Sequence, residues 1–305
     1  MTSATTILDG GMGQELARRS ASPPTPLWSS KVLLEEPELV VALHREYVEA
    51  GADVITLASY AATPERLARH GVAERFDALQ DAALDAARRA RDAAGDADLR
   101  LAGSLPPLVG SYHPETMPEP EAALASYRRI VARQAGGVDL LLCETMGSIA
   151  EARAAASAAL ETDLPVWVAL SVDDDRSGRL RSGESVLAAR ETLEPLGIEA
   201  LLLNCSTPEA IDAAWPGLAG AGIPIGVYAN AFTSVAALEP GGTVDVLETR
   251  TPLTLGVVHQ PTREAFYTHW AEALGLPVPA FAAPVAAPHR FELLDLDGAR
   301  PWVSG

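Results

Sequence analysis

Short apolar runs alternate with alanine-rich segments along most of this 305-residue chain, and that alternation restricts the possible folds more than any other feature. The apolar runs have the length and composition of strands that are buried on both faces. They are residues 5–9, 53–58, 99–104, 138–143, 165–171, 199–204 and 223–229. Helical spacing of apolar residues marks the segments 37–50, 75–94, 119–135, 148–161, 184–196, 207–219 and 262–274. This strand-then-helix order predicts an α/β fold with a parallel sheet.

Repeated strand–helix units favour a closed (β/α)8 TIM barrel in a single domain, with an open doubly wound sheet as the alternative. No strand is followed by the Gly-x-Gly-x-x-Gly pattern that binds dinucleotides, since residues 10–13 have a different glycine spacing. The eighth strand has two candidates, 253–258 and the proline-rich 276–287. The proline-rich stretch 105–120 is predicted to be a long surface loop.

Charge and composition exclude several classes of partner. The formal net charge of −18 disfavours nucleic acid and anionic membrane surfaces, which both need clustered Lys and Arg. No apolar run approaches the roughly 18 residues that span a membrane, and the first residues lack the pattern of a signal peptide. Two distant cysteines, Cys143 and Cys205, do not make a disulfide framework. We therefore expect a cytoplasmic protein with reduced thiols.

Polar residues follow several of the predicted strands, at the end of a barrel where function collects. Asp9 and Gly10 follow the first strand, Glu144 the fourth, Asn204 and Cys205 the sixth, and Asn230 the seventh. A carboxylate can take an ammonium group, and amides or backbone N–H groups can take a carboxylate. Together these residues suit a small zwitterionic ligand.

Each of these residues also has a purely structural interpretation. Asp9 precedes two glycines and could form a turn. Cys205 follows an apolar strand and could be a small core residue. Glu144 is harder to explain as a structural residue, because it follows a buried apolar strand, where an acid needs a partner. Neighbouring side chains on a strand point to opposite faces, so we expect Cys143 to face the helices if Glu144 faces the barrel mouth. His259 is a further candidate for acid–base chemistry or metal binding.

Several collinear segments resemble the homocysteine S-methyltransferase family. Ile7 to Leu16 resembles the first strand of that family, and the match extends over about residues 5–235. The other matching segments are 51–56 with Tyr60 and 63–64, 103–104, 139–145, 178–184, 203–208 and 227–232. The resemblance implies an eight-stranded barrel, one domain over 1–305 with a divergent C-terminal part at about 236–305, and a role in methionine biosynthesis.

The resemblance also implies site residues and a cofactor. Asp9 and Glu144 match the acids that hold the amino acid end of homocysteine, and Cys205 matches one of three cysteine ligands of a zinc ion. The other two ligands belong to a Gly-Gly-Cys-Cys-Gly run. That run is missing under both alignments of the tail, which place either 281–285 or 256–259 there. Zinc is thus expected from the family, while this chain lacks two of its three ligands.

We carry three functional hypotheses forward. The first is methyl transfer from a sulfonium donor, S-adenosylmethionine or S-methylmethionine, to a small thiol such as homocysteine, with Cys205 and Glu144 as catalytic residues. In it, Asp9, Gly10, Glu144, Asn204 and Asn230 bind the substrate. The second is a metal-free barrel that binds an amino acid or sulfonium metabolite as a sensor, a partner subunit or a divergent enzyme. The third is a metal-free lyase or hydrolase with Glu144 as general base.

Overall fold

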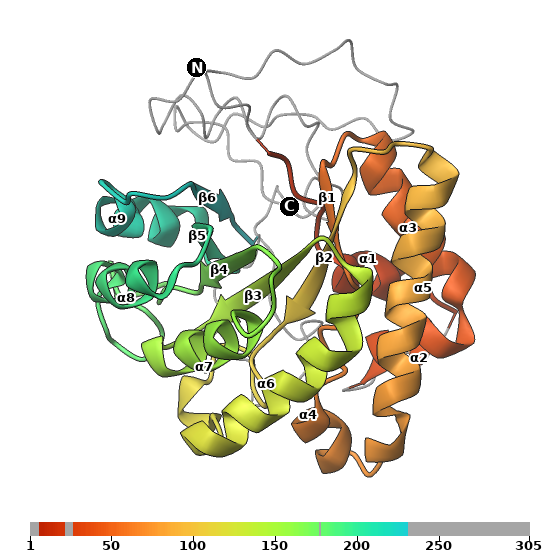
Figure 1. The fold of residues 1–305 in the computed structure, drawn as a ribbon, viewed down its shortest axis with the longest axis horizontal. Helices are drawn as coiled ribbons and strands as arrows, with labels where there is room; N and C mark the ends of the chain where they lie inside the picture. Colours follow the sequence, from red (N-terminus) through yellow and green to blue (C-terminus); the bar gives the residue numbers. More distant parts are fainter. Residues whose placement is uncertain (1–5, 22–26, 177, 231–305) are drawn as a thin grey trace.

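A single parallel sheet forms the centre of the computed structural model, which describes residues 6–21, 27–176 and 178–230. Its six strands are hydrogen-bonded in chain order, so each strand lies next to the one that follows it (Figure 1). They are β1 (Val54–Thr56), β2 (Arg100–Leu105), β3 (Leu140–Met146), β4 (Val166–Leu170), β5 (Ala200–Asn204) and β6 (Ile225–Tyr228). The sheet curls into half a barrel, which confirms the predicted α/β class and parallel order.

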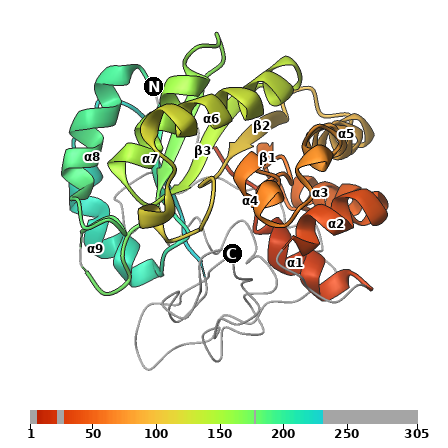
Figure 2. The ribbon, with the colours of Figure 1, turned by 90° about the horizontal axis from the view of Figure 1, so that it is seen from below.

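Nine α-helices in the described part of the chain form an arc around the outside of the curled sheet (Figure 2). They are α1 (Met12–Arg19), α2 (Trp28–Glu35), α3 (Pro37–Glu49), α4 (Pro64–Arg69), α5 (Phe76–Ala94), α6 (Pro120–Gln134), α7 (Ile149–Ala159), α8 (Val186–Leu193) and α9 (Pro208–Leu218). Short 3₁₀ turns are η1 (Ala73–Arg75), η2 (Pro114–Thr116), η3 (Ala135–Gly137) and η4 (Glu194–Leu196).

The first predicted strand is reduced to a single bridge. Leu8 pairs in parallel with Val54, and the Asp9 amide donates to the Val54 carbonyl at 2.9 Å. The segment 7–16 does not continue as a strand, because α1 begins at Met12. The predicted strand 5–9 is therefore observed as this bridge and its flanking hydrogen bonds.

Two apolar layers lie on the two faces of the sheet, as side-chain alternation requires. The larger layer lies between the sheet and the helices and includes Leu141 and Cys143 of β3. The smaller layer lies on the concave face and includes Leu140 and Leu142 of the same strand. Glu144 is the next residue in the concave register, so Cys143 and Glu144 face opposite sides of the sheet, as predicted.

Helix ends explain most differences from the predicted boundaries. Ser148 caps α7 by accepting from the Glu151 amide, and Ser185 caps α8 by accepting from the Ala188 amide. The Ser185 cap sets the start of α8 at Val186, and the predicted helix 184–196 is observed as α8 followed by η4. The predicted helix 262–274, both candidates for an eighth strand and His259 lie outside the described residues. Within those residues, no helix has the combined length and apolar character needed to cross a bilayer.

Candidate functional site

A polar layer follows the apolar layer at the carboxyl ends of the strands. Side chains two residues apart on a strand share a face, so the residue two positions after the last buried apolar residue of the concave face also points to that face. Strands β1 to β5 each supply one such residue. These residues are Thr56, Ser104, Glu144, Ser171 and Asn204. Apolar side chains close the space below them, so a ligand has to bind from the carboxyl ends of the strands.

Asp9 lies beside this layer and is held by Thr56. Its Oδ2 accepts from the Thr56 amide at 2.8 Å, and its Oδ1 accepts from Thr56 Oγ1 at 3.1 Å. Burial raises the pKa of Asp9 to about 8; the Thr56 hydrogen bonds oppose that rise and the nearby Glu144 carboxyl adds to it. Thr56 and Ser104, which bind Asp9 and Glu144, lie on the neighbouring strands β1 and β2, so the two acids share one region of the site. Gly10 follows Asp9 directly and is half-buried.

Glu144 has the partner that its position requires. Ser104 Oγ donates to Oε1 of Glu144 at 2.5 Å. Burial raises the pKa of Glu144 to about 7, while Ser104 and the charge of Arg66 counter the rise. The pairing of β3 with β4 shifts register between Cys143 and Met146. Such a bulge changes the direction of a side chain locally, and it occurs here at Glu144 and Thr145.

Cys205 follows β5, and its sulfur is surrounded by hydrogen-bonding groups. Thr145 Oγ1 lies 3.4 Å from Sγ and Asn204 Nδ2 lies 3.3 Å from it. The Tyr112 side chain also acts on the sulfur and lowers the pKa of the thiol. Burial nevertheless raises the pKa of the Cys205 thiol to about 11. The described contacts therefore favour a neutral thiol at neutral pH.

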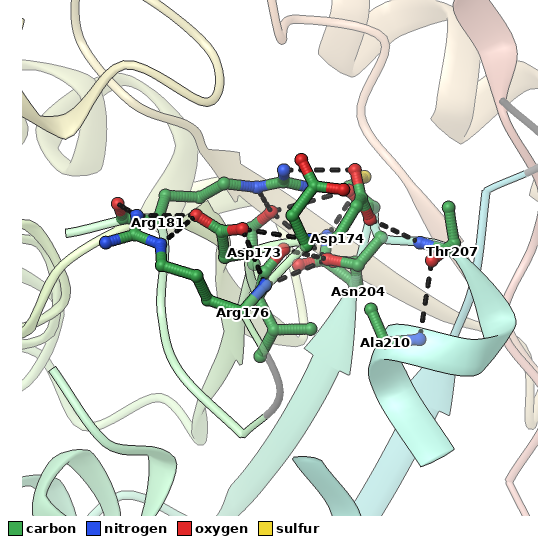
Figure 3. Close-up of polar contacts among 12 residues, drawn as sticks. Asp173, Asp174, Arg176, Arg181, Asn204, Thr207 and Ala210 are labelled. Carbon is green, nitrogen blue, oxygen red and sulfur yellow. Dashed lines mark hydrogen bonds and ion pairs between the residues drawn. The ribbon is translucent and has the colours of Figure 1, made fainter. Parts of the chain in front are cut away.

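A buried ion pair supports the turn that carries Cys205 (Figure 3). Arg181 Nη1 donates to Asp174 Oδ2 at 3.0 Å, and both side chains are less than a tenth exposed, at 8% and 7%. The Thr207 amide donates to the other oxygen of Asp174 at 2.9 Å. Arg181 also donates to the Cys205 carbonyl at 3.4 Å and lies over the Tyr112 ring, 5.0 Å from its centroid.

Backbone strain is concentrated at the same place. The non-glycine residues with positive φ in the described structure are Tyr112 (67°), Thr145 (62°) and Cys205 (48°), and all three meet around the Cys205 sulfur. A β-branched residue such as Thr145 is rarely found in this conformation. Strained backbone persists where surrounding contacts enforce it, and it is typical of functional sites.

The residues present do not fit the zinc site that the resemblance implies. A zinc ion needs at least three protein ligands. Across residues 6–21, 27–176 and 178–230, no group of three or more His, Cys, Asp or Glu side chains is placed to hold a metal. The other of the two cysteines in the sequence, Cys143, is buried in the outer core. The nearest polar groups of Cys205 are an amide nitrogen and hydroxyls, which are not the thiolates that such a site uses.

The two predicted asparagines are placed differently. Asn204 is fully buried, where its Oδ1 accepts from the Thr145 amide at 3.1 Å and its Nδ2 donates to Thr145 Oγ1 at 3.0 Å. It thereby fixes the bend after β3. Asn230 is 8% exposed, and its backbone N–H donates to the Ser206 carbonyl at 3.0 Å.

Sequence reasoning missed three residues of the site: Arg66, Tyr112 and Arg181. Tyr112 lies in the proline-rich stretch that was predicted to be a surface loop, yet Leu105 and Leu108 in that stretch are buried. That stretch folds over the carboxyl ends of the strands, where Tyr112 contacts Cys205. Two prolines followed by an apolar residue at 106–108 were a signal that the stretch packs against the protein.

Comparison with known proteins gives a consistent assignment. The family described as homocysteine S-methyltransferase matches residues 6–273. The homocysteine S-methyltransferase of Escherichia coli (strain K12) is 35% identical over 251 residues, which are 73% of this chain and 77% of that protein. The chain belongs to the homocysteine S-methyltransferase family. Another relative, homocysteine S-methyltransferase 1 of Arabidopsis thaliana, is 30% identical, with 68% of this chain and 70% of that protein covered.

Solved structures of the family agree with the observed fold. The crystal structure of the homocysteine methyltransferase MmuM from Escherichia coli, in its metallated form, is similar with a TM-score of 0.67 and 32% identity. The match covers 75% of this chain and 84% of that chain. A selenocysteine Se-methyltransferase from Brassica oleracea var. italica is 30% identical over 68% of this chain and 66% of that protein. The relatives of this chain thus include proteins named as methyltransferases for sulfur and for selenium.

Proposed function

We propose that this protein transfers a methyl group from a sulfonium donor, S-methylmethionine or S-adenosylmethionine, to a small thiol such as homocysteine. Family membership and the relatives at 30–35% identity support the reaction class. The structural observation that carries the proposal is the pair of half-buried acids, Asp9 and Glu144, which are held by Thr56 and Ser104 on the neighbouring strands β1 and β2. That pair suits the ammonium group of an amino acid.

The proposed roles follow from the placement of each residue. Asp9 and Glu144 hold the ammonium group, and Gly10 offers a backbone N–H beside them. Asn204 acts through Thr145 and Cys205, because its amide is hydrogen-bonded to both. Cys205 lies beside the reacting sulfur. Asn230 lines the proposed site after β6, where its backbone N–H donates to the Ser206 carbonyl.

The reaction needs one proton removed from the acceptor thiol. The acceptor sulfur forms a bond to the methyl carbon, the bond from that carbon to the donor sulfur breaks, and the positive charge of the sulfonium disappears. Glu144, whose pKa is about 7 before the ligand binds, is ionised when it holds the ammonium group, so the thiol proton passes to solvent. Because the described residues do not fit a three-cysteine zinc site, no step here depends on a metal.

A binding protein without the transfer step is the second candidate function. The absence of the Gly-Gly-Cys-Cys-Gly run from the sequence favours it. The raised pKa of the Cys205 thiol, about 11, also favours it. In this alternative the acids still hold an amino acid or a sulfonium metabolite, and the protein acts as a sensor or a partner subunit.

The finer features of the architecture are also proposals. We infer a complete eight-stranded barrel in one domain. The solved family structure, with its TM-score of 0.67, supports the barrel. The cytoplasm is the proposed compartment, and a small amino acid and a sulfonium compound are the proposed partners.

A transfer assay tests the proposed function. The full-length protein is incubated with S-methylmethionine or S-adenosylmethionine and homocysteine, with and without added zinc, and methionine is measured by mass spectrometry. We expect turnover that falls at least about tenfold in Glu144→Gln and persists in Cys143→Ala, a control at the buried thiol on the outer face. No turnover under any condition would contradict the enzymatic proposal, and thermal stabilisation by methionine in that case would support the binding protein.

A further inference from the structure

A fixed positive charge lies beside the acids of the site, on the short helix α4. The guanidinium of Arg66 lies over the Tyr60 ring, 5.1 Å from its centroid. Its Nη2 donates to the Pro107 carbonyl at 3.0 Å and to Ser111 Oγ at 3.2 Å. Ser111 in turn lies 2.7 Å from the Tyr60 hydroxyl. These contacts hold Arg66 in one place, between α4 and the proline-rich stretch.

One donor of Arg66 is left over. Its Nε is buried and has no hydrogen-bond partner among the described residues. A buried N–H group without a partner is costly, and more so when it belongs to a charged side chain. An acceptor that reaches this nitrogen would remove that cost. A guanidinium offers a fork of donors whose geometry matches a carboxylate.

Arg66 and Tyr60 face the same region as the proposed pocket. The charge of Arg66 acts on the Glu144 carboxyl. Glu144 and Cys205 both act electrostatically on the Tyr60 hydroxyl. A cation beside Glu144 weakens the binding of a ligand that carries only an ammonium group, because the two positive charges repel each other. A ligand that carries both an ammonium and a carboxylate group meets an opposite charge at each end.

We propose that Arg66 binds the α-carboxylate of the amino acid ligand while Glu144 and Asp9 hold its ammonium group, which makes Arg66 a specificity-determining residue for α-amino acids over simple amines. This inference rests on the proposed ammonium pocket. Homocysteine and the sulfonium donors each carry an α-ammonium and an α-carboxylate group. The proposed site therefore recognises the α-amino acid part of either substrate.

Binding measurements test the inference without any turnover. L-Methionine and 3-(methylthio)propylamine, which lacks the carboxylate, are titrated calorimetrically into the wild type, Arg66→Gln and Arg66→Lys. We expect the wild type to prefer methionine by about 10- to 100-fold, as a charge-assisted hydrogen bond allows. Arg66→Gln should lose most of that preference, because it weakens methionine binding and spares the amine. Arg66→Lys should keep part of it, because it keeps the charge but not the fork.

Two control variants separate recognition from general damage. Arg69→Gln removes an exposed positive charge from the same helix, and it should leave the preference unchanged. Ser111→Ala removes a contact that Arg66 makes with the proline-rich stretch, without removing charge. Ser111→Ala should change the affinities for methionine and for the amine by the same factor. If Ser111→Ala abolishes the preference as fully as Arg66→Gln does, Arg66 only positions the stretch and the inference is overturned.

The transfer assay then assigns the source of the carboxylate. A KM increase of about tenfold or more for homocysteine alone in Arg66→Gln assigns the acceptor, and an increase for the sulfonium donor alone assigns the donor. An unchanged preference for methionine in Arg66→Gln overturns the inference, even where methyl transfer is observed. Conversely, Arg66-dependent methionine binding without any transfer supports the inference and contradicts the enzymatic proposal.

Discussion

Burial sets the protonation of single residues in this site. Both Asp9 and Glu144 have pKa values raised by burial, to about 8 and about 7. Hydrogen bonds from Thr56 and Ser104 limit the rise without cancelling it. When no ligand is bound, a large share of these two acids is therefore protonated near neutral pH. An ammonium group binds the ionised form, so ligand binding and proton release are coupled.

This coupling predicts a pH-dependent affinity. From pH 6 to pH 8 the affinity for methionine should increase, by up to about tenfold per pH unit for each acid below its pKa. Calorimetric titration at pH 6, 7 and 8 checks the trend. Ser104→Ala removes a hydrogen bond that lowers the pKa of Glu144, so it should shift the rise in affinity to higher pH. An affinity that stays constant across this range would mean that the ligand does not contact these acids.

At the scale of elements, strand β2 has to pass close to helix α6. A β-carbon on Gly103 would lie 2.6 Å from Gln134 Oε1 and 2.8 Å from Leu141 Cδ2. Gln134 is fully buried and donates to Ser59 Oγ at 3.1 Å and to Gln80 Oε1 at 2.8 Å. The glycine thus leaves space for a polar network that ties α6 to α5 and to the loop after β1.

A methyl group at this position tests the network. Gly103→Ala should lower the free energy of unfolding by about 1–3 kcal/mol, because Gln134 has to move in a closely packed interior. Urea unfolding measures the loss. Gly136→Ala is the matched control, since a β-carbon there meets nothing within 4 Å. Equal stability of the two variants would show that Gln134 can move at no cost.

The sequence predicts the elements of this fold where periodicity is strong and misses those where packing decides. Alternation through Leu140 to Glu144 places Cys143 against the helices, and the outer core confirms it. The short helices α1, α2 and α4 carry too few residues to give a clear period, and α4 begins where Thr63 caps it. Arg66 belongs to the site because α4 packs beside the proline-rich stretch, which no local pattern reveals.

The candidate site divides in the same way. The acids of the site follow apolar strands, so elementary rules about buried charge single out Glu144. Tyr112 and Arg181 lie on loops that are distant in the sequence from Cys205, yet they contact each other and Arg181 contacts the Cys205 carbonyl. Their positions depend on how these loops fold over the strand ends, and sequence spacing alone does not determine that.

At the scale of the whole molecule, buried ionisable groups give the stability an overall pH dependence. Asp9, Glu144 and Glu151 have folded-state pKa values raised by burial from 3.8, 4.5 and 4.5 to about 8, 7 and 7. Their contribution to stability is complete below about pH 4 and is lost as the pH rises through 7 and 8. Burial lowers the pKa of His44 from 6.5 to about 4, so its contribution has the opposite sign and is lost as the pH falls from 6.5 to 4.

Three acids outweigh one histidine, and the net charge of −18 adds repulsion as the pH rises. The protein should therefore unfold at a lower temperature at pH 8 than at pH 5.5. Glu151 is the group to test, because it is 3% exposed and accepts from the Gly147 amide at 2.9 Å, away from the proposed ligand contacts.

Glu151→Gln keeps an oxygen acceptor for Gly147 and removes the charge that burial disfavours. At pH 8 it should raise the free energy of unfolding by about 1–3 kcal/mol relative to the wild type, and by less at pH 5.5, which lies between the unfolded and the folded pKa of Glu151. Thermal and urea unfolding at both pH values measure the difference. Glu161→Gln provides the comparison, because that exposed carboxyl has its pKa lowered by Arg128 and should not gain stability at pH 8. If Glu151→Gln instead shows the same pH dependence as the wild type, burial of this carboxyl is not what destabilises the folded protein in alkali.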